Sequence, residues 1–390
     1  MKSDWKECTL AELGESVGGA TPSTKDEQNY GGDIAWITPK DLSTLKGRFI
    51  SRGERNITEK GLRSCSAQIM PKNAVLFSSR APIGYVAIAA NPVCTNQGFK
   101  SIVSNSDNDP MFLYYLLKYN KNAIEAMGSG TTFKEVSGST MRGIRVYVPI
   151  SKAEQQRIAA ILSALDEKIA INREINDNLQ QQAASIFAEW LNTCTDFSTI
   201  GDMAHNILDY SPVGSEQIRL LNSSDVTEGV FPIAPLVPNK DLKGHFKKRF
   251  KFGDILYSEI RPRNHHYGFV LFDASDYIAS TRLMVIRAIE NKVSPAMLYQ
   301  YLLLPEVEGE FTLKTESRSG TFPQGNYADM ASIQVPYSPT NSQTAVSEIL
   351  SRIRFAIAQN QFESQRLAEL RDTLLPKLMS GEIDVSAVQP

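Results

Sequence analysis

The sequence predicts an α+β fold in which two globular domains are joined by two long helices that form an antiparallel coiled coil. Three observations predict it. The two halves repeat the same order of segments. Each half closes with a stretch of about 40 residues that has helical apolar spacing. The remainder consists of short β-rich stretches bounded by Gly, Pro, Asn and Asp. The predicted segments are a first domain, a central helix, a second domain and a C-terminal helix, at residues 1–151, 152–194, 195–340 and 341–390.

The internal repeat contains seven matching segments in the same order, which chance does not readily explain. The first match pairs Ile34–Leu42 with Ile218–Val226, and the next pairs Ala74–Ser78 with Asp254–Ser258. The other matches are a basic turn (Arg80–Gly84 with Arg261–Gly268), a polar triplet (Thr95–Gln97 with Ser280–Arg282), a Pro-initiated helix (Pro110–Leu117 with Pro295–Leu302), a Ser-Gly-Thr (Ser129–Thr131 with Ser319–Thr321) and a closing Val-Pro (Val148–Pro149 with Val335–Pro336). The repeat predicts an approximate two-fold duplication of one domain.

The two long helices carry apolar residues at steps of three and four. The first runs from Lys152 to about Asn192 without Pro or Gly, and its stripe recurs in the second helix at a constant offset of 188 residues. A helix of this length spans roughly 60 Å and does not bury such a stripe alone, so we expect the two helices to pack antiparallel.

Two features of the helices carry more specific predictions. Asn172 and, 188 residues later, Asn360 fall within the stripe. They are either surface positions or a buried pair that fixes the register of the coil. Pro376 lacks an N–H group, so the second helix should end or kink near Leu375.

Composition bounds the class of protein. The chain has 390 residues, 42% of them hydrophobic, and 41 Lys and Arg against 43 Asp and Glu, for a net charge of −2. This composition is that of a globular protein. The N-terminus does not have the pattern of a signal peptide, and no apolar stretch is long enough to cross a membrane. Four scattered cysteines favour neither a disulfide framework nor a metal site, so we expect a cytoplasmic protein.

The small net charge conceals two basic stretches at corresponding places in the repeat. From Lys40 to Arg80 there are nine Lys and Arg against three acidic residues, and from Lys240 to Arg263 there are eight against three. Such clusters are typical of contact with nucleic-acid phosphates, although each single residue could instead be a solvated surface charge. The candidate DNA-binding residues are Lys40, Arg80, Asn96, Gln97, Lys134, Lys247, Lys248, Arg249, Arg261, Arg263, Arg282 and Arg318.

Catalytic motifs are missing from the sequence. No phosphate-binding loop of the form G-x-x-x-x-G-K-[ST] occurs, and Asn91-Pro92 is not followed by the residues of an amino-methyltransferase loop. His265-His266 has no carboxylate or cysteine at ligand spacing, so we expect no metal site. The sequence predicts a non-catalytic chain that binds no cofactor.

The chain resembles the specificity (S) subunits of type I restriction-modification enzymes over essentially its full length. The stretches that carry the resemblance are Trp36–Leu42, Leu76–Gly84, Gln155–Ile169 and Leu374–Ile383. The resemblance implies that each target-recognition domain reads one part of a bipartite site in double-stranded DNA and that the coil sets the spacer.

The resemblance also implies partners. Two methyltransferase (M) subunits would dock on the coil, and nuclease/translocase (R) subunits would join that core of two M subunits and one S subunit. S-adenosylmethionine, ATP and Mg would be bound by those partners rather than by this chain. The alternatives from the residues alone are a stand-alone two-domain DNA-binding regulator, and a scaffold that uses the coil for protein partners.

Overall fold

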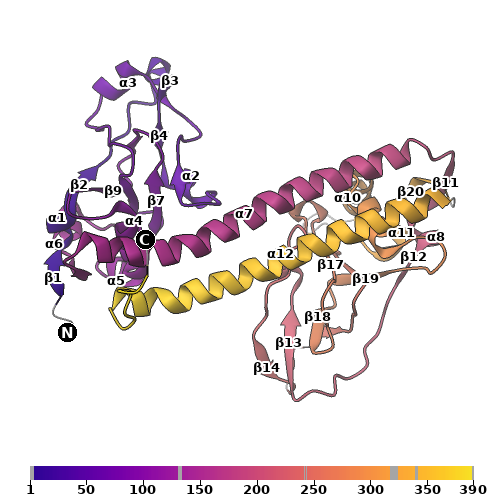
Figure 1. Cartoon of the computed structure of the whole chain (residues 1–390). Helices are drawn as coiled ribbons and strands as arrows, with labels where there is room; N and C mark the ends of the chain where they lie inside the picture. The colour runs from indigo at the N-terminus through magenta and orange to yellow at the C-terminus, as the bar shows by residue number, and fades with distance from the viewer. Residues whose placement is uncertain are drawn as a thin grey trace. The chain divides into compact units, whose positions relative to one another are not determined.

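The computed structural model describes residues 4–130, 134–240, 242, 244–316, 324–338 and 341–388, and the chain divides into two compact units. Unit 1 contains Met1–Ala170 and Leu367–Pro390, and unit 2 contains Ile171–Arg366. Each unit therefore combines one globular domain with a segment of each long helix. The predicted α+β class is confirmed, because each domain mixes short strands with short helices (Figure 1).

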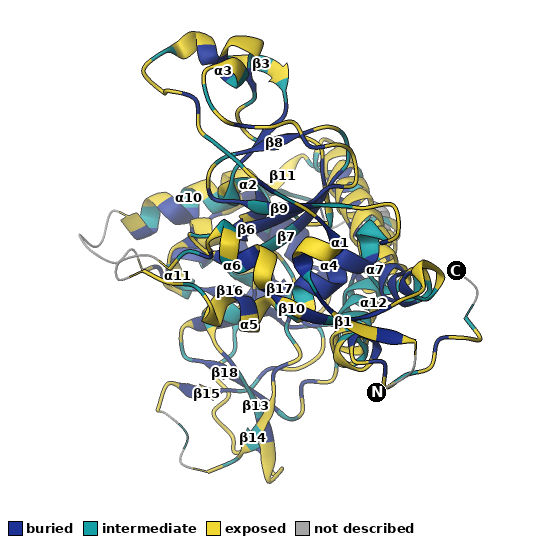
Figure 2. Cartoon of the chain, turned by 90° about the vertical axis from the view of Figure 1, so that its left-hand side faces the viewer, coloured by how far each residue is buried: buried dark blue, intermediate teal, exposed yellow. Residues whose placement is uncertain are grey.

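The domain of unit 1 is built on a five-stranded sheet with the order β2-β9-β6-β7-β5. Its strands pair antiparallel except for β5, which runs parallel to β7. Figure 2 shows the central strands in the buried colour, and every residue of β6 is buried. Two smaller pairs complete the domain, β1 with β10 (antiparallel) and β4 with β8 (parallel). The strands are β1 (Trp5–Thr9), β2 (Gly14–Gly18), β3 (Tyr30–Ile34), β4 (Trp36–Ile37), β5 (Phe49–Ile50), β6 (Val75–Ser79), β7 (Ile83–Ala89), β8 (Cys94–Thr95), β9 (Lys100–Ser104) and β10 (Arg145–Pro149).

The domain of unit 2 contains two four-stranded sheets, ordered β12-β19-β16-β17 and β14-β13-β18-β15. A separate antiparallel pair, β11 with β20, corresponds to β1 with β10. The strands are β11 (Asp196–Thr199), β12 (Ala204–Asn206), β13 (Gln217–Leu221), β14 (Leu236–Pro238), β15 (Phe246–Lys248), β16 (Ile255–Ser258), β17 (Tyr267–Phe269), β18 (Tyr277–Ser280), β19 (Leu283–Ala288) and β20 (Gln334–Tyr337).

The strand orders bear out the internal duplication. The order β2-β9-β6-β7 in unit 1 is matched by β12-β19-β16-β17 in unit 2, with antiparallel pairing throughout both. The parallel pair β4 with β8 is likewise matched by β13 with β18. The sheets of the two halves therefore correspond strand by strand over these elements, whereas the Ser-Gly-Thr match falls partly outside the described residues, at Thr131 and Ser319–Thr321.

Short helices follow the strands in both halves. The Pro-initiated helices have a proline in the first turn, where no N–H group is needed, and a side-chain cap before it. The helices of unit 1 are α1 (Leu10–Leu13), α2 (Pro39–Ser43), α3 (Glu59–Arg63), α4 (Pro110–Tyr119), α5 (Lys121–Ala126) and α6 (Gly138–Gly143), with the 3₁₀ turn η1 (Glu27–Asn29). Those of unit 2 are α8 (Ile200–Met203), α9 (Pro295–Leu302), α10 (Pro305–Glu316) and α11 (Tyr327–Ala331), with η2 (Ser223–Asp225) and η3 (Pro262–Asn264).

The two long helices are α7 (Lys152–Leu191) and α12 (Asn341–Met379), and their segments pack antiparallel within each unit. In unit 1, Asp166 pairs with Arg371, and Leu162 shares a core with Leu378. In unit 2, Phe187 shares a core with Leu350. The ends of the apolar stripe thus contribute to the cores of the globular domains as well as to the helix pair.

A layer of asparagines lies between the helices in unit 2. The Nδ2 of Asn172 donates to the carbonyl oxygen of Asn360 (3.4 Å), to Glu363 Oε2 (2.7 Å) and to Ser364 Oγ (3.2 Å). The Asn360 side chain donates to Asn176 Oδ1 (2.8 Å). Asn172 is fully buried, whereas Asn360 is half-buried. The two predicted asparagines are in contact, and Asn176, which the sequence analysis did not single out, joins them.

Of the two outcomes expected at Pro376, an end or a kink of the second helix near Leu375, the end is wrong and the kink stays a prediction. The helix α12 continues through Pro376 to Met379, and the carbonyl oxygen of Pro376 accepts from the Ser380 N–H (3.0 Å). The reason is packing. Leu378 and Met379 are buried in the core of unit 1, which favours a further turn despite the proline.

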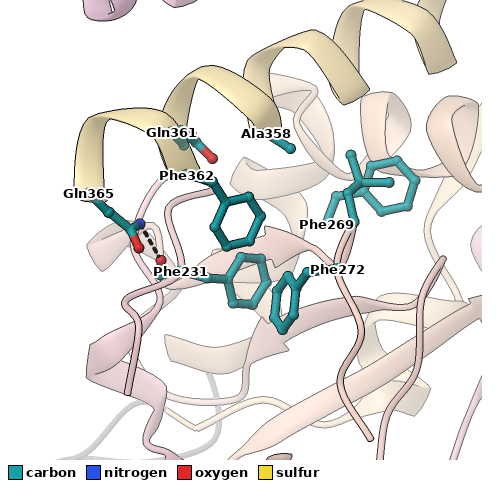
Figure 3. Close-up of a pocket in the computed structure, with 8 residues that line it drawn as sticks. Phe231, Phe269, Phe272, Ala358, Gln361, Phe362 and Gln365 are labelled. Atoms are coloured by element: carbon teal, nitrogen blue, oxygen red, sulfur yellow. Dashed lines mark hydrogen bonds between the residues drawn. The ribbon is translucent and has the colours of Figure 1, made fainter. Parts of the chain in front are cut away.

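The second domain also packs on α12 within unit 2. Phe231, Phe272 and Phe362 form an edge-to-face stack with ring centroids 5.1 and 5.7 Å apart (Figure 3). Gln365 Nε2 donates to the carbonyl oxygen of Phe231 (2.6 Å). The small hollow that these side chains line lies between the domain and its own helix segment, so we interpret it as a packing contact.

Among the described residues, no helix is long and apolar enough to cross a membrane. The four cysteines are free thiols. Burial raises the pKa of the Cys94 thiol to about 12, and it also raises the pKa of Cys8.

Candidate nucleic-acid interface

The basic turn of the first domain connects β6 to β7. Ser78, at the end of β6, is buried, and its hydroxyl donates to the carbonyl oxygen of Pro82 (2.8 Å) and accepts from the Tyr85 N–H (2.8 Å). These two bonds fix the turn from below. The backbone position from which the Arg80 side chain extends is therefore fixed.

Arg80 is held by a carboxylate of its own chain. Its Nη1 lies 3.3 Å from Glu135 Oε2, and Lys100 Nζ lies 3.5 Å from Glu135 Oε1. About a third of the Arg80 side chain remains exposed (34%). The guanidinium is thus oriented on one edge and accessible on another.

Two further cations lie in this region that sequence reasoning missed. Lys100 and Arg142 both lie against Gly138, where a Cβ would be 3.8 Å from Lys100 Cε and 3.4 Å from Arg142 Nη1. A bridge between Ser78 and Phe99 brings Lys100 beside the end of β6. Only the strand pairing could have identified Lys100, because it lies outside the basic run.

The polar loop before β9 lies beside the turn, because the Ser79 N–H donates to the carbonyl oxygen of Gly98 (2.7 Å). Asn96 Oδ1 accepts from the Gly98 N–H (2.8 Å), and Gln97 Oε1 accepts from the hydroxyl of Thr21. The structure therefore places Asn96 and Gln97 near Arg80, with their side-chain oxygens engaged within the loop. Lys134 is exposed, next to Glu135 in the chain.

The basic run from Lys40 to Arg80 is partly neutralised. At least five of its nine cations form ion pairs within the chain, namely Lys40, Arg48, Lys60, Arg63 and Arg80. Lys40 pairs with Glu54 (2.6 Å), whose hydrogen bond raises the pKa of the lysine. A further arginine, Arg55, lies over the Tyr30 ring at 3.8 Å. More than half of the cations in this run are therefore ion-paired within the chain, although Lys40 and Arg63 remain largely exposed.

The basic turn of the second domain also follows a buried serine, but its hydrogen bonds and its shape differ. Ser258, the counterpart of Ser78, accepts from the Ile260 N–H (3.1 Å). Arg261 and His265 adopt left-handed backbone angles (φ 45° and 54°) on either side of the 3₁₀ turn η3. Arg261 is exposed, and the Glu259 N–H donates to the carbonyl oxygen of Arg282 (2.9 Å). This main-chain bond places Arg282 beside the turn that carries Arg261.

Carboxylates hold this second turn as well. Arg263 Nη2 lies 3.5 Å from Glu316. His265 lies between Glu228 (Nδ1 to Oε1, 3.3 Å) and Glu308 (Nε2 to Oε1, 3.0 Å). Burial alone would lower the pKa of His265, but its hydrogen bonds to Glu228 and Glu308 outweigh this effect and raise it.

The three predicted cations of the β15 region differ from one another. Lys247 is exposed. Lys248 is buried (3% exposed), and its Nζ donates to the carbonyl oxygen of Leu283 (2.8 Å) beside Glu259 (3.7 Å). Arg249 donates to the carbonyl oxygens of Pro212 (3.4 Å) and Ser275 (3.0 Å). Lys248 is therefore corrected to a core lysine, and Arg249 joins loops. Arg318 lies outside the described residues.

Each of the two turns offers charged donors. Within the part of the chain that the structure describes, no group of three or more His, Cys, Asp and Glu side chains could hold a metal ion. Guanidinium and amide groups at tight turns can contact phosphates and base edges. Each domain thus places such groups at the same point of the repeat.

Comparison with known proteins identifies the family. The profile described as "Type I restriction modification DNA specificity domain" matches residues 2–181 and 233–371. The MjaIX specificity subunit of Methanocaldococcus jannaschii, a type I restriction enzyme subunit, is 32% identical over 99% of this chain and 95% of the relative. This chain belongs to the type I restriction-modification specificity family.

Other relatives agree with this assignment. The HindI specificity subunit of Haemophilus influenzae is 34% identical over 45% of this chain and 39% of its own length. Among solved structures, the type I S subunit of M. genitalium matches with a TM-score of 0.62 at 18% identity, over 96% of both chains. The type I specificity fold therefore extends over both domains and both long helices.

Proposed function

We propose that this chain is the DNA-specificity subunit of a type I restriction-modification complex and carries no catalytic centre of its own. One observation carries the proposal beyond family membership. The two domains share a strand order, and each presents an accessible arginine at the same turn of that order, Arg80 in one and Arg261 in the other. Because the two turns differ in sequence and shape, the two parts of the target are expected to differ.

The helix pair has a separate role in this proposal. It fixes the spacing between the two parts of the site and offers the docking surface for two methyltransferase subunits. Nuclease/translocase subunits join that core in a system that also restricts DNA. S-adenosylmethionine is bound by the methyltransferase partners, and ATP and Mg by the partner subunits. Methylation then occurs on a base flipped into the partner's active site.

The decisive experiment separates the two half-sites. The chain is co-expressed with its methyltransferase in a host without adenine methylation, and sequencing of the modified genome gives the target. Arg80→Ala and Arg261→Ala are then compared on duplexes that carry either part intact. We expect each variant to lose about tenfold in affinity through its own part alone.

Arg145→Ala is a suitable control, because Arg145 is an exposed arginine of β10 paired with Glu7 (3.5 Å). It should leave the affinity for both parts unchanged. If either turn variant weakened both parts equally, the assignment of one part to each domain would be wrong. If the wild-type chain directed no site-specific methylation, the specificity role itself would be refuted.

A further inference from the structure

Glu135 lies at the centre of the cation group in the first domain. Its two carboxylate oxygens take different partners, Arg80 for Oε2 (3.3 Å) and Lys100 for Oε1 (3.5 Å). Lys134 and Arg142 lie nearby, against Gly128 and Gly138. A carboxylate at this position repels DNA phosphates, so its presence costs affinity for DNA of any sequence. A role for Glu135 in DNA recognition therefore has to act through a neighbouring residue rather than through attraction to phosphate.

The backbone fixes the position of this carboxylate. The Glu135 N–H donates to the carbonyl oxygen of Ser129 (2.9 Å), and the Ser129 N–H donates back (3.0 Å). The next residue, Val136, is buried, and its N–H donates to the carbonyl oxygen of Ser79 (3.0 Å). Main-chain bonds on both sides therefore set Glu135 directly beside the turn that carries Arg80.

We infer that Glu135 is a positioning residue that orients the Arg80 guanidinium for base reading in the first part of the target; this inference rests on the proposed function. An arginine has five N–H donors, and the bond to Glu135 uses one edge of that fork. A charge-assisted bond restricts the long side chain before DNA binds, so less rotamer freedom is lost on contact. Discrimination of guanine needs the guanidinium plane held in place.

The second domain has a different pair of residues at the corresponding bridge. The corresponding bridge joins Ile260 to Gln324, so neither an arginine nor a carboxylate stands at that place. Glu259 instead lies next to the buried Lys248 (3.7 Å). Loss of the Glu135 charge should therefore affect only the first part of the target.

The test uses the full chain in complex with its methyltransferase. The duplexes carry the target sequence that the methylation sequencing identifies. Glu135→Gln keeps the size of the side chain and removes its charge. Affinity is measured for the intact site, for a site with the first part altered and for a site with the second part altered, over a range of salt concentrations. Glu7→Gln removes a carboxylate from an ion pair of the same unit, Glu7 with Arg145 (3.5 Å), and serves as the matched control.

We expect Glu135→Gln to reduce discrimination of the first part by about tenfold, with discrimination of the second part and the melting temperature unchanged. In an Arg80→Ala background the same change should have no further effect on discrimination. Glu7→Gln should behave as the wild type.

Three results would overturn the inference. Glu135→Gln could leave first-part discrimination within about twofold of the wild type. It could raise affinity for every duplex without altering discrimination, which would make Glu135 a repulsive charge only. It could also lower discrimination equally without Arg80, which would make Glu135 a direct contact. A wild-type complex without any site preference would instead refute the proposed function, and the inference with it.

Discussion

The two units use equivalent positions of the long helices in opposite ways. In unit 1, Asp166 accepts from the Tyr115 hydroxyl (2.7 Å) and from Arg371 Nη1 (2.6 Å). In unit 2, the residue 188 positions after Asp166 is Arg354. Arg354 is buried (7% exposed), donates to Gln300 Oε1 and lies over the Tyr299 ring at 4.8 Å.

This difference shows what the duplication has kept and what it has changed. The contact between helix and domain is kept, since Gln300 of α9 corresponds to Tyr115 of α4. The charge is not kept, because Asp166 corresponds to Arg354, and the position equivalent to Arg371 in the other helix is occupied by Ala183. Among the described residues, no carboxylate pairs with the buried guanidinium of unit 2, and its Nε has no hydrogen-bond partner.

Burial affects the two groups differently. On its own it would raise the pKa of Asp166, but hydrogen bonds from Tyr115 and Arg371 outweigh it and hold the pKa below its ordinary value. Burial lowers the pKa of the Arg354 guanidinium. Unit 1 thus has an ion pair where, among the described residues of unit 2, the guanidinium contacts the uncharged side chains of Gln300 and Tyr299.

The largest effect is expected from Asp166→Ala. It removes the acceptor of the Tyr115 hydroxyl and the more buried of the two carboxylates that pair with Arg371, the other being Asp372 (2.8 Å), which should cost about 3 kcal/mol of unfolding free energy. Urea unfolding measures the loss, and hydrogen exchange of α4 and α7 should locate it in unit 1. Asp177→Ala, at an exposed acid of the same helix, should change the free energy by less than about 0.5 kcal/mol. Equal losses in both variants would contradict the role of the pair.

A matched pair of substitutions sharpens the comparison. Arg371→Met should destabilise by about 2 kcal/mol, because it removes the partner of Asp166. Arg354→Met should be neutral or stabilise by about 1 kcal/mol, since an apolar side chain of similar size replaces an uncompensated buried charge. Both values come from the same urea titrations. Should Arg354→Met be as damaging as Arg371→Met, Gln300 and Tyr299 would have to be sufficient partners for the guanidinium.

The smallest effect concerns pH and His265. Because its folded-state pKa is raised, protonation stabilises unit 2 below about pH 6.5, and the contribution is lost as pH rises through the folded value. The side chain is 38% exposed, so the contribution should be only about 0.5 kcal/mol. His265→Gln should lower the melting temperature at pH 5.5 but not at pH 8.5. The exposed His205→Gln is the control, and an identical loss at both pH values would exclude protonation as the cause.

Much of the architecture could be predicted because it follows periodic and repeated patterns. The 188-residue offset placed Asn172 opposite Asn360, and the segment order placed Arg80 and Arg261 at equivalent turns. The polar partners could not be predicted in this way. Glu135 is 55 residues from Arg80, and Glu167 is 119 residues from Arg48, so only strand pairing and helix packing bring them together. Lys248 was misjudged because alternation along a three-residue strand does not reveal which face is buried.

The C-terminal end of α12 bears on how the chain is made. Leu378, Met379 and Val385 share a core with Trp5 in unit 1, and Gly381 lies against the Trp5 ring. Residues 171–366 must therefore be synthesised before unit 1 can close, which at about 10 residues per second takes roughly 20 s. During that interval the core of the first domain lacks the side chains of Leu378, Met379 and Val385. Unit 2 is complete once Arg366 has been synthesised, whereas unit 1 also needs the residues from Leu367 onward. The unit that is begun second is therefore the first to have all of its residues.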